Sequence, residues 1–463
     1  MQFATTNPYT GEVVETFTPT TPQDVLDAIG RADTAFRSWR TTSFAKRAAI
    51  MQKAADILRA EIDDFAPVLT LEMGKLLGEA KAEVELCAEI FEYYVENAET
   101  LLAPQTLPVR RASEGKATLH CEPLGVLLAI EPWNFPYYQI ARIIAPQLSA
   151  GNAILLKHSE NVPRSAARFV DLMRRAGLPD GLFINLYMPH DQVELVLNDP
   201  RVQGVALTGS ERAGSIVAAA AGKALKKSTM ELGGADAFVV LSDADLDKTV
   251  KWAVFGRHWN AGQVCVSSKR MIVADEIYDE FMDRYLKGIA ELRMGDPLDP
   301  ATTLAPLSSQ RAADNLRAQI DQARAHGATV TEVGPEAPNQ GAFVRPTVLT
   351  DLADDNPARH WEFFGPVSMV FRARTEEDAV RIANDTPFGL GGSVFTTDTQ
   401  RGIDLAKRIT TGMVFVNHPT MVKADLPFGG VGRSGYGREL LDLGIKEFVN
   451  HKLVDVVDID APF

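Results

Sequence analysis

The sequence predicts an α/β protein of two doubly wound domains with a small additional β arm. Short apolar strands alternate with helical segments from Gly125 onward, and a second series of the same kind starts near Ala237. Such alternation is typical of parallel sheets whose two faces are covered by helices. At 463 residues the chain is also too long for one ordinary core, so two or three domains are expected.

Each series is defined by its candidate strands. The first has strands at 126–130, 153–157, 183–186, 205–208 and 229–232, with helices at 162–176 and 211–223 between them. The second has strands at 237–241, 269–273, 367–371, 393–395 and 413–416. The two units therefore meet near residues 232–234.

The N-terminal part is helical in pattern. Apolar residues recur with helical spacing over 22–39 and 45–60, and then over a long, charge-rich stretch from 65 to 102. Prolines break this pattern between 104 and 114. Residues 116–122 alternate as a strand does, and residues 447–457 predict a terminal strand.

Composition excludes several classes of protein. A formal net charge of -14 disfavours nucleic acid or an anionic membrane as partner, although solubility alone explains the acidity. The three cysteines form no disulfide framework and no metal-binding or redox Cys-x-x-Cys pattern, which favours a reducing compartment. The N-terminus lacks the features of a signal peptide, and no apolar run could span a membrane. We expect a cytoplasmic protein without a metal site.

Two segments carry the reactive groups. Cys265 ends the segment NAGQVC at 260–265, where small neighbours leave its thiol approachable, and Glu231 precedes a glycine turn in MELGG at 230–234. A thiol that forms a covalent adduct and a carboxylate that activates water suit the oxidation of an aldehyde. Taken alone, Cys265 is more often a buried apolar residue, and Glu231 a structural acid at a strand end.

A dinucleotide site is indicated more weakly. The Gly-x-Gly-x-x-Gly signature follows none of the strands. Gly209 and Ser210 instead follow a strand and start a helix, where a phosphate can bind, although Ser210 as a simple N-cap is the commoner role. Lys157 and Glu160 close another strand, where they would bond ribose hydroxyls or form a solvated ion pair.

Seven segments together resemble the aldehyde dehydrogenase superfamily over essentially the whole chain. They are PWNFP (132–136), LK (156–157), TGS (208–210), ELGG (231–234), GQVC (262–265), EFFGP (362–366) and PFGG (427–430). Within that superfamily the chain is most similar to the shorter bacterial succinate-semialdehyde dehydrogenases, as residues 161–163 and 433–440 indicate.

The resemblance implies roles for the residues of these segments. Cys265 would be the nucleophile, Glu231 the general base and Asn134 the oxyanion donor. The implied cofactor residues are Lys157 and Glu160 on the adenosine ribose, Gly209 and Ser210 at the pyrophosphate, Glu362 on the nicotinamide ribose, and Trp133 and Phe364 as walls.

The resemblance also implies the division of the chain. A Rossmann-like cofactor domain would comprise residues 1–103, 124–232 and 431–446, and a catalytic domain residues 233–430. Residues 104–123 and 447–463 would form an arm that pairs subunits into a homodimer or homotetramer.

Glu160 bears on the choice of cofactor. A carboxylate accepts hydrogen bonds from two ribose hydroxyls but repels a 2′-phosphate, and many relatives have serine at this position. The sequence therefore predicts NAD in preference to NADP.

The substrate is ambiguous. Tyr138 and Arg142 lie one helical turn apart, and Arg142 would bind the distal carboxylate of succinate semialdehyde, unless it forms a structural ion pair. Val422 replaces a usual serine and Trp259 a usual glutamine, which favours a narrower or more apolar pocket. An aromatic or medium-chain aldehyde is therefore the alternative substrate.

Two further alternatives are less favoured. A CoA-acylating dehydrogenase shares the cysteine but usually lacks a base such as Glu231. A non-catalytic binding protein on the same fold would not need Cys265, Glu231 and Asn134 together.

Overall fold

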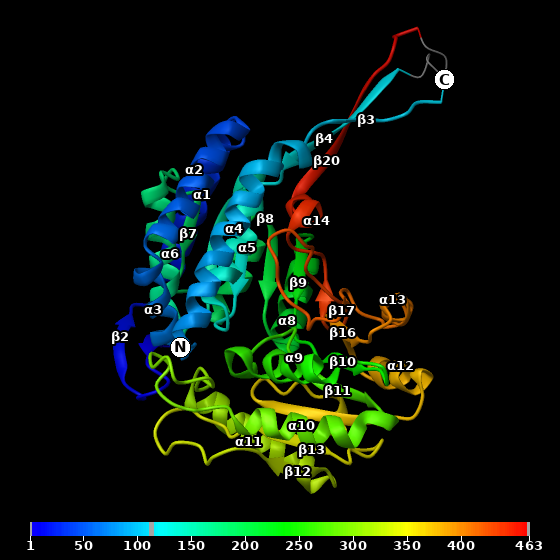
Figure 1. Ribbon diagram of the computed structural model, residues 1–463. Helices are drawn as coiled ribbons and strands as arrows, with labels where there is room; N and C mark the ends of the chain where they lie inside the picture. Colours follow the sequence, from blue (N-terminus) through cyan, green and yellow to red (C-terminus); the bar gives the residue numbers. More distant parts are fainter. Residues whose placement is uncertain (1, 111–114, 461–463) are drawn as a thin grey trace.

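The structure is a computed structural model that describes residues 2–110 and 115–460 (Figure 1). Two parallel sheets organise it. The first has the strand order β19-β9-β8-β5-β6-β7, in which only the short β19 runs antiparallel to its neighbour. Its strands are β5 (Val126–Glu131), β6 (Ala153–His158), β7 (Phe183–Asn185), β8 (Val202–Thr208), β9 (Lys227–Glu231) and β19 (Gly435–Tyr436).

Helices from the N-terminal half, together with one helix near the C-terminus, pack with this sheet into one apolar core. They are α1 (Pro22–Trp39), α2 (Phe44–Ala60), α3 (Ile62–Met73), α4 (Leu77–Leu101), α5 (Pro136–Ala150), α6 (Pro163–Ala176), α7 (Val193–Asn198), α8 (Glu211–Lys223) and α14 (Leu441–Lys446). Every residue of α5 is buried. Residues at both ends of the chain thus build the same core.

The second sheet has the order β12-β13-β14-β11-β10-β16-β17, antiparallel only at β12. Its strands are β10 (Asp236–Val240), β11 (Ser268–Ala274), β12 (Thr329–Glu332), β13 (Thr347–Thr350), β14 (Val367–Ala373), β16 (Gly392–Phe395) and β17 (Phe415–Val416). Its helices are α9 (Leu246–His258), α10 (Tyr278–Ala290), α11 (Gln310–Ala325), α12 (Glu376–Asn384) and α13 (Thr399–Ala406).

Alternate residues of β10 show that both faces of this sheet are covered. Val239 belongs to an apolar cluster shared with α11, α12 and α13, whereas Phe238 and Val240 belong to a separate cluster shared with α9 and α10. Successive strand residues point to opposite faces, so each cluster is one covered face. The expected α/β fold of two doubly wound units is confirmed, and the domain boundaries stay a prediction.

The arm lies apart from both sheets. Strand β4 (Lys116–Pro123) pairs antiparallel with β20 (Val449–Val456) on one side and with β3 (Gln105–Thr106) on the other. Figure 1 shows this ribbon extending well beyond the body of the molecule. Part of the predicted break at 104–114 lies outside the described residues.

One helix prediction is wrong. The stretch 65–102 forms two helices, α3 and α4, separated at Gly74. Gly74 has a φ of +78° and ends α3, a left-handed conformation that glycine adopts without steric cost. Apolar spacing continues through the break, so it gave no signal in the sequence.

The remaining elements are small. They are the hairpin of β1 (Phe3–Thr6) and β2 (Val13–Phe17), the pair β15 (Phe388–Gly389) and β18 (Val431–Gly432), and 3-10 turns at His190–Gln192, Trp259–Gly262, Asp275–Ile277 and Pro357–His360. Among the described residues, no helix is long and apolar enough to cross a membrane.

Candidate active site

Cys265 lies in the short connection that leads into β11, where two cavities meet. Asn260 and Ala261 before it have φ values of 51° and 53°, and Gly262 follows at 75°. These left-handed residues turn the chain sharply between α9 and the cysteine. One cavity, of about 340 Å³, and a second, of about 250 Å³, are both lined by Cys265. A group bonded to its sulfur therefore has access to both.

Burial dominates the ionisation of the thiol. It raises the pKa of Cys265 to about 12, against the opposing effect of Lys269 and Arg142. Lys269 is itself buried, and its Nζ donates hydrogen bonds of 2.7 Å to the carbonyl oxygens of Val264 and Cys265. Lys269 thus fixes the backbone that carries the thiol and places a cation beside it.

Asn134 lies beside the thiol, immediately before α5. It is buried, its Nδ2 donates to the Gln263 carbonyl at 3.1 Å, and its own carbonyl accepts from Asn260 Nδ2 at 2.9 Å. Asn134 lines the 250 Å³ cavity together with Cys265. Since a primary amide carries two N–H donors, one remains for an oxygen bound near the sulfur.

Glu231 ends β9 and is buried without a hydrogen bond to either carboxylate oxygen in the described part of the chain. Burial raises its pKa well above the ordinary value, and Glu439 adds to that shift while Arg142 opposes it. Glu231 lines neither cavity. A base role therefore requires its side chain to turn from this position toward the sulfur.

Arg142 lies outside the cavity in which the sequence placed it. Its guanidinium pairs with the buried Glu439, and it donates to the Tyr138 hydroxyl at 3.1 Å and to Thr208 Oγ1 at 2.7 Å. Neither cavity is lined by Arg142. The predicted helical stacking with Tyr138 is present, but the expected reach of Arg142 to a substrate carboxylate is not, because Glu439 already occupies the guanidinium.

The 340 Å³ cavity is largely aromatic and aliphatic. Tyr138, Trp259 and Val422 line it, as expected of substrate-binding residues. Trp259 lies between two other rings, with centroid distances of 5.4 Å to Phe135 and 6.0 Å to Phe255. An elongated apolar group is accommodated by such a lining.

One wall of this cavity is charged. Along α4 and the turn before it, Lys75 pairs with Glu83, and its Nζ lies 3.7 Å from the centre of the Phe135 ring. Glu83 also accepts from the backbone amides of Tyr137 and Tyr138, at 2.8 and 3.1 Å. The pair therefore anchors the start of α5 and leaves a cation within the cavity wall.

The 250 Å³ cavity holds most of the predicted cofactor residues. Trp133 and Phe364 form adjoining walls with ring centroids 5.7 Å apart, and Glu362, Gly209 and Ser210 also line the cavity. Ser210 also caps α8, accepting from the Ala213 amide at 3.3 Å. An aromatic-walled groove with a carboxylate and a helix N-terminus has the donors and acceptors that a dinucleotide requires.

Glu362 is held in place by two contacts. Its Oε1 accepts from the Gly234 amide at 3.0 Å and lies 3.4 Å from Lys269 Nζ. Lys269 thereby connects the carboxylate of the groove to the backbone of the nucleophile.

Lys157 and Glu160 lie beyond this cavity, at the end of β6. Burial lowers the pKa of Lys157, and Glu160 opposes that shift. Arg311 approaches Glu160 at 4.0 Å. Burial also lowers the pKa of nearby His190, to which Lys157 and Arg212 contribute. The carboxylate of Glu160 thus lies near two cations, Lys157 and Arg311.

Three residues of the site were not predicted. Gln139 and Cys265 are the two residues common to the linings of both cavities in the described chain. Lys269 holds the cysteine backbone, and Glu439 pairs with Arg142. A glutamine within the apolar segment 136–150 was the available signal for Gln139; the sequence offers none for the pairing of Glu439.

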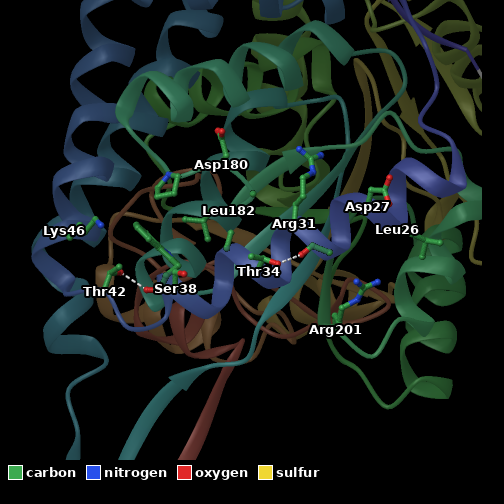
Figure 2. Close-up of a pocket in the computed structure, with 15 residues that line it drawn as sticks. Leu26, Asp27, Arg31, Thr34, Ser38, Thr42, Lys46, Asp180, Leu182 and Arg201 are labelled. Atoms are coloured by element: carbon green, nitrogen blue, oxygen red, sulfur yellow. Dashed lines mark hydrogen bonds between the residues drawn. The ribbon is translucent and has the colours of Figure 1, made fainter.

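A larger cavity of about 840 Å³ lies elsewhere, along the outer face of α1 (Figure 2). Thr34 and Thr42 line it, but their hydroxyls donate to backbone carbonyls of the same helix region, Gly30 at 2.9 Å and Trp39 at 2.7 Å. None of the predicted site residues lines this cavity. The predicted reactive groups therefore lie away from this larger cavity.

Comparison with known proteins finds relatives that match nearly the whole chain. The chain is 51% identical to the succinate-semialdehyde dehydrogenase [NADP(+)] of Deinococcus radiodurans, over 98% of this chain and 94% of that protein. It is 47% identical to succinate-semialdehyde dehydrogenase [NADP(+)] 1 of Mycobacterium tuberculosis, over 98% and 99% of the two chains.

A solved structure has a very similar fold. The succinic semialdehyde dehydrogenase of Streptococcus pyogenes, in complex with NADP+, superposes with a TM-score of 0.96 at 44% identity, over 98% of this chain and 100% of that chain.

These relatives correct the prediction of NAD, which is wrong. The relatives from Deinococcus and Mycobacterium are named for NADP+, and the Streptococcus structure contains it. The prediction considered the carboxylate of Glu160 alone. In the structure Lys157 and Arg311 act on that carboxylate, and such cations offset its repulsion of a 2′-phosphate.

The model of the aldehyde dehydrogenase family matches residues 1–454. With the relatives above, this match extends over nearly the whole sequence, including the segments that carry Cys265, Glu231 and Asn134. The chain therefore belongs to the aldehyde dehydrogenase family.

Proposed function

We propose that the protein oxidises succinate semialdehyde to succinate with NADP+, through a thioester on Cys265. The observation that carries this proposal is the position of the cysteine, where the two cavities meet. One cavity would hold the aldehyde and the other the nicotinamide end of the cofactor. The substrate and cofactor follow the names of relatives 47–51% identical to this chain.

The chemistry begins with addition of the Cys265 sulfur to the aldehyde carbon, which forms a thiohemiacetal. The free N–H of Asn134 and the Cys265 amide would donate to its oxyanion, and losing one such donor typically costs roughly 10²–10³-fold in rate. A nicotinamide bound in the adjoining cavity would supply the hydride acceptor, and the oxidised adduct on Cys265 would be a thioester. Glu231 would then take a proton from the water that hydrolyses the thioester.

Residues on both sides of the groove would hold the cofactor. Trp133 and Phe364 enclose it, Glu362 would accept from ribose hydroxyls, and the start of α8 at Gly209 and Ser210 would face phosphate. Lys157, with Glu160, would bind the adenosine ribose and its 2′-phosphate.

A second candidate substrate is an aromatic or medium-chain aldehyde. Val422 and the rings around Trp259 offer no hydrogen bond to a carboxylate, and Arg142 is paired with Glu439. Only Lys75 in the cavity wall supplies a cation among the described lining residues, and it is paired with Glu83.

The effect of the substrate's distal carboxylate on the rate distinguishes the two candidate substrates. Succinate semialdehyde and butanal differ by this group, so we expect kcat/KM for succinate semialdehyde to exceed that for butanal by about 100-fold, the value of one charged hydrogen-bonded contact. NADPH formation measures both rates. Equal rates, or faster oxidation of butanal, would favour the second candidate.

The exposed edge of the arm bears on how subunits assemble. Strand β20 forms an edge of its sheet, and its apolar side chains Leu453, Val454 and Val456 are 58%, 41% and 68% exposed. An exposed apolar edge strand is a surface for pairing with another chain. We propose that the arm joins subunits into a homodimer or homotetramer.

A further inference from the structure

Gln139 occupies the junction at which the reaction occurs. It lies on α5, the helix that begins just after Asn134, and it lines the 340 Å³ cavity and the 250 Å³ cavity, as Cys265 does. Any group that passes from one cavity to the other meets both residues. Neither the base Glu231 nor the buried Arg142 has this position.

The side chain of Gln139 is buried with its amide oxygen unpaired. It is 2% exposed, and its Oε1 has no hydrogen-bond partner in the described chain. Gln147 on the same helix is equally buried, but its amide donates to the Gly444 carbonyl at 2.8 Å and accepts from Asn152 at 3.0 Å. A buried amide oxygen without a partner is unfavourable, so the amide of Gln139 is suited to a partner that arrives during the reaction.

We propose that Gln139 is a catalytic residue whose side-chain amide binds and orients the water that hydrolyses the Cys265 thioester. This rests on the proposed thioester chemistry. The water oxygen bonds to the thioester carbon, one water proton passes to Glu231, and the carbon–sulfur bond breaks. The electron pair returns to sulfur, giving the carboxylic acid and the Cys265 thiolate.

The geometry favours water over the other groups that an amide could bind. Asn134 already offers a donor beside the sulfur for the oxyanion. Glu231 has no hydrogen bond of its own and lines neither cavity, so water in the junction needs a second group to orient it. A glutamine amide both donates and accepts, as a bound water requires.

An ester that acylates the thiol directly isolates this step from aldehyde oxidation. p-Nitrophenyl acetate would acylate Cys265 with a burst of nitrophenolate and needs no cofactor, after which hydrolysis sets the steady state. In Gln139→Met we expect an unchanged burst and a steady rate lowered roughly 10–100-fold, the effect of misplacing a reacting group. Intact-protein mass spectrometry should show the acetyl group remaining on the enzyme.

Three controls separate a positioning role of Gln139 from a structural one. Gln147→Met removes an equally buried amide from the same helix and should lower the melting temperature without changing the ratio of burst to steady rate. Gln139→Glu retains an oxygen at the same distance along the side chain and should restore hydrolysis at least in part. Hydroxylamine, a strong nucleophile, should release the acetyl group equally fast from the native enzyme and Gln139→Met.

Two results would overturn the proposal. A steady ester-hydrolysis rate in Gln139→Met equal to that of the native enzyme would show that water needs no help from this amide. A slower burst would assign Gln139 to acylation instead. Failure of the proposed function is separate, because it would appear as absent NADPH formation in the native enzyme with any aldehyde.

Discussion

The fold buries the Glu231 side chain, whereas the Cys265 side chain is partly exposed and lines both cavities. Burial raises the pKa of the thiol to about 12 and the pKa of the carboxyl well above its ordinary value. The thiol is therefore protonated at neutral pH in this structure, and the shift at Glu231 favours its protonated carboxyl. The cations that oppose these shifts, Lys269 and Arg142, are buried with them, so each reactive group depends on a residue that does not itself react.

The raised thiol pKa predicts how the free enzyme reacts with iodoacetamide. Only the thiolate is alkylated, and below its pKa the thiolate fraction rises about tenfold for each pH unit. The alkylation rate of Cys265 should therefore climb with a slope near one from pH 6 to pH 9 without levelling off. Peptide mapping of the labelled cysteine measures the rate. A rate that begins to level off near pH 9 would mean that the thiol titrates near its ordinary value.

Arg142 and Glu439 predict a stability effect. Arg142→Met leaves Glu439 buried without its cation, which typically costs about 3–5 kcal/mol. The double variant Arg142→Met, Glu439→Gln removes both charges and should regain much of that loss. Urea unfolding followed by fluorescence provides the comparison. A double variant less stable than Arg142→Met would contradict a compensated ion pair.

These residues also show the limit of sequence reasoning. Cys265, Asn134 and Tyr138 belong to local motifs, so their neighbourhood was predictable. Glu439, the partner of Arg142, lies near the other end of the chain. Its ion pair with Arg142 holds the guanidinium outside the cavity. The prediction of NAD from Glu160 was wrong for the same reason. Arg311, which approaches Glu160, lies far away in the sequence.

At the scale of elements, the apolar strands were the most predictable. The strands predicted at 126–130, 153–157 and 269–273 lie within β5, β6 and β11, because strands covered on both faces are continuously apolar. Strands β12 and β13 were both missed. β12 forms an edge of its sheet and is mostly exposed, so the pattern there carries little signal, whereas β13 is buried but only four residues long. The break between α3 and α4 depends on one glycine.

Gly74 predicts a measurable cost at that break. An alanine at φ +78° pays about 1–2 kcal/mol for the left-handed backbone, and its Cβ would also lie 2.9 Å from Pro306. Gly74→Ala should therefore lower the free energy of unfolding by at least that amount. Gly222 on α8 is the matched control, because nothing lies within 4 Å of an added Cβ there. Gly222→Ala should stabilise the protein by about 0.5–1 kcal/mol; similar effects at both sites would refute the explanation.

For the whole molecule, the two sheets and the connection between them create the site. Glu231 ends a strand of the first sheet, and β10 starts the second sheet a few residues later. Cys265 leads into β11 of the second sheet, whereas Asn134 and Gln139 belong to the first. The two cavities thus lie between the units, where ligands commonly bind. The arm alone extends away from this body.

The arm predicts the state of assembly. Val454→Lys with Val456→Glu places charges on the exposed edge strand, which should prevent pairing with another chain. Light scattering after size exclusion should then give the 50.5 kDa of one subunit instead of a multiple of it. Leu298→Lys, at a side chain 54% exposed away from the arm, is the control and should leave the mass unchanged. An unchanged mass in the arm variant would place the interface elsewhere.

The central claim is the covalent thioester on Cys265. Enzyme mixed with succinate semialdehyde and NADP+, quenched in acid during turnover and digested, should carry one succinyl group on the peptide of Cys265, and none when NADP+ is omitted. Glu231→Gln should increase the trapped fraction, since hydrolysis of the thioester would slow. Full NADPH formation by Cys265→Ala, or a succinyl group on Cys87 or Cys121 instead, would contradict the account.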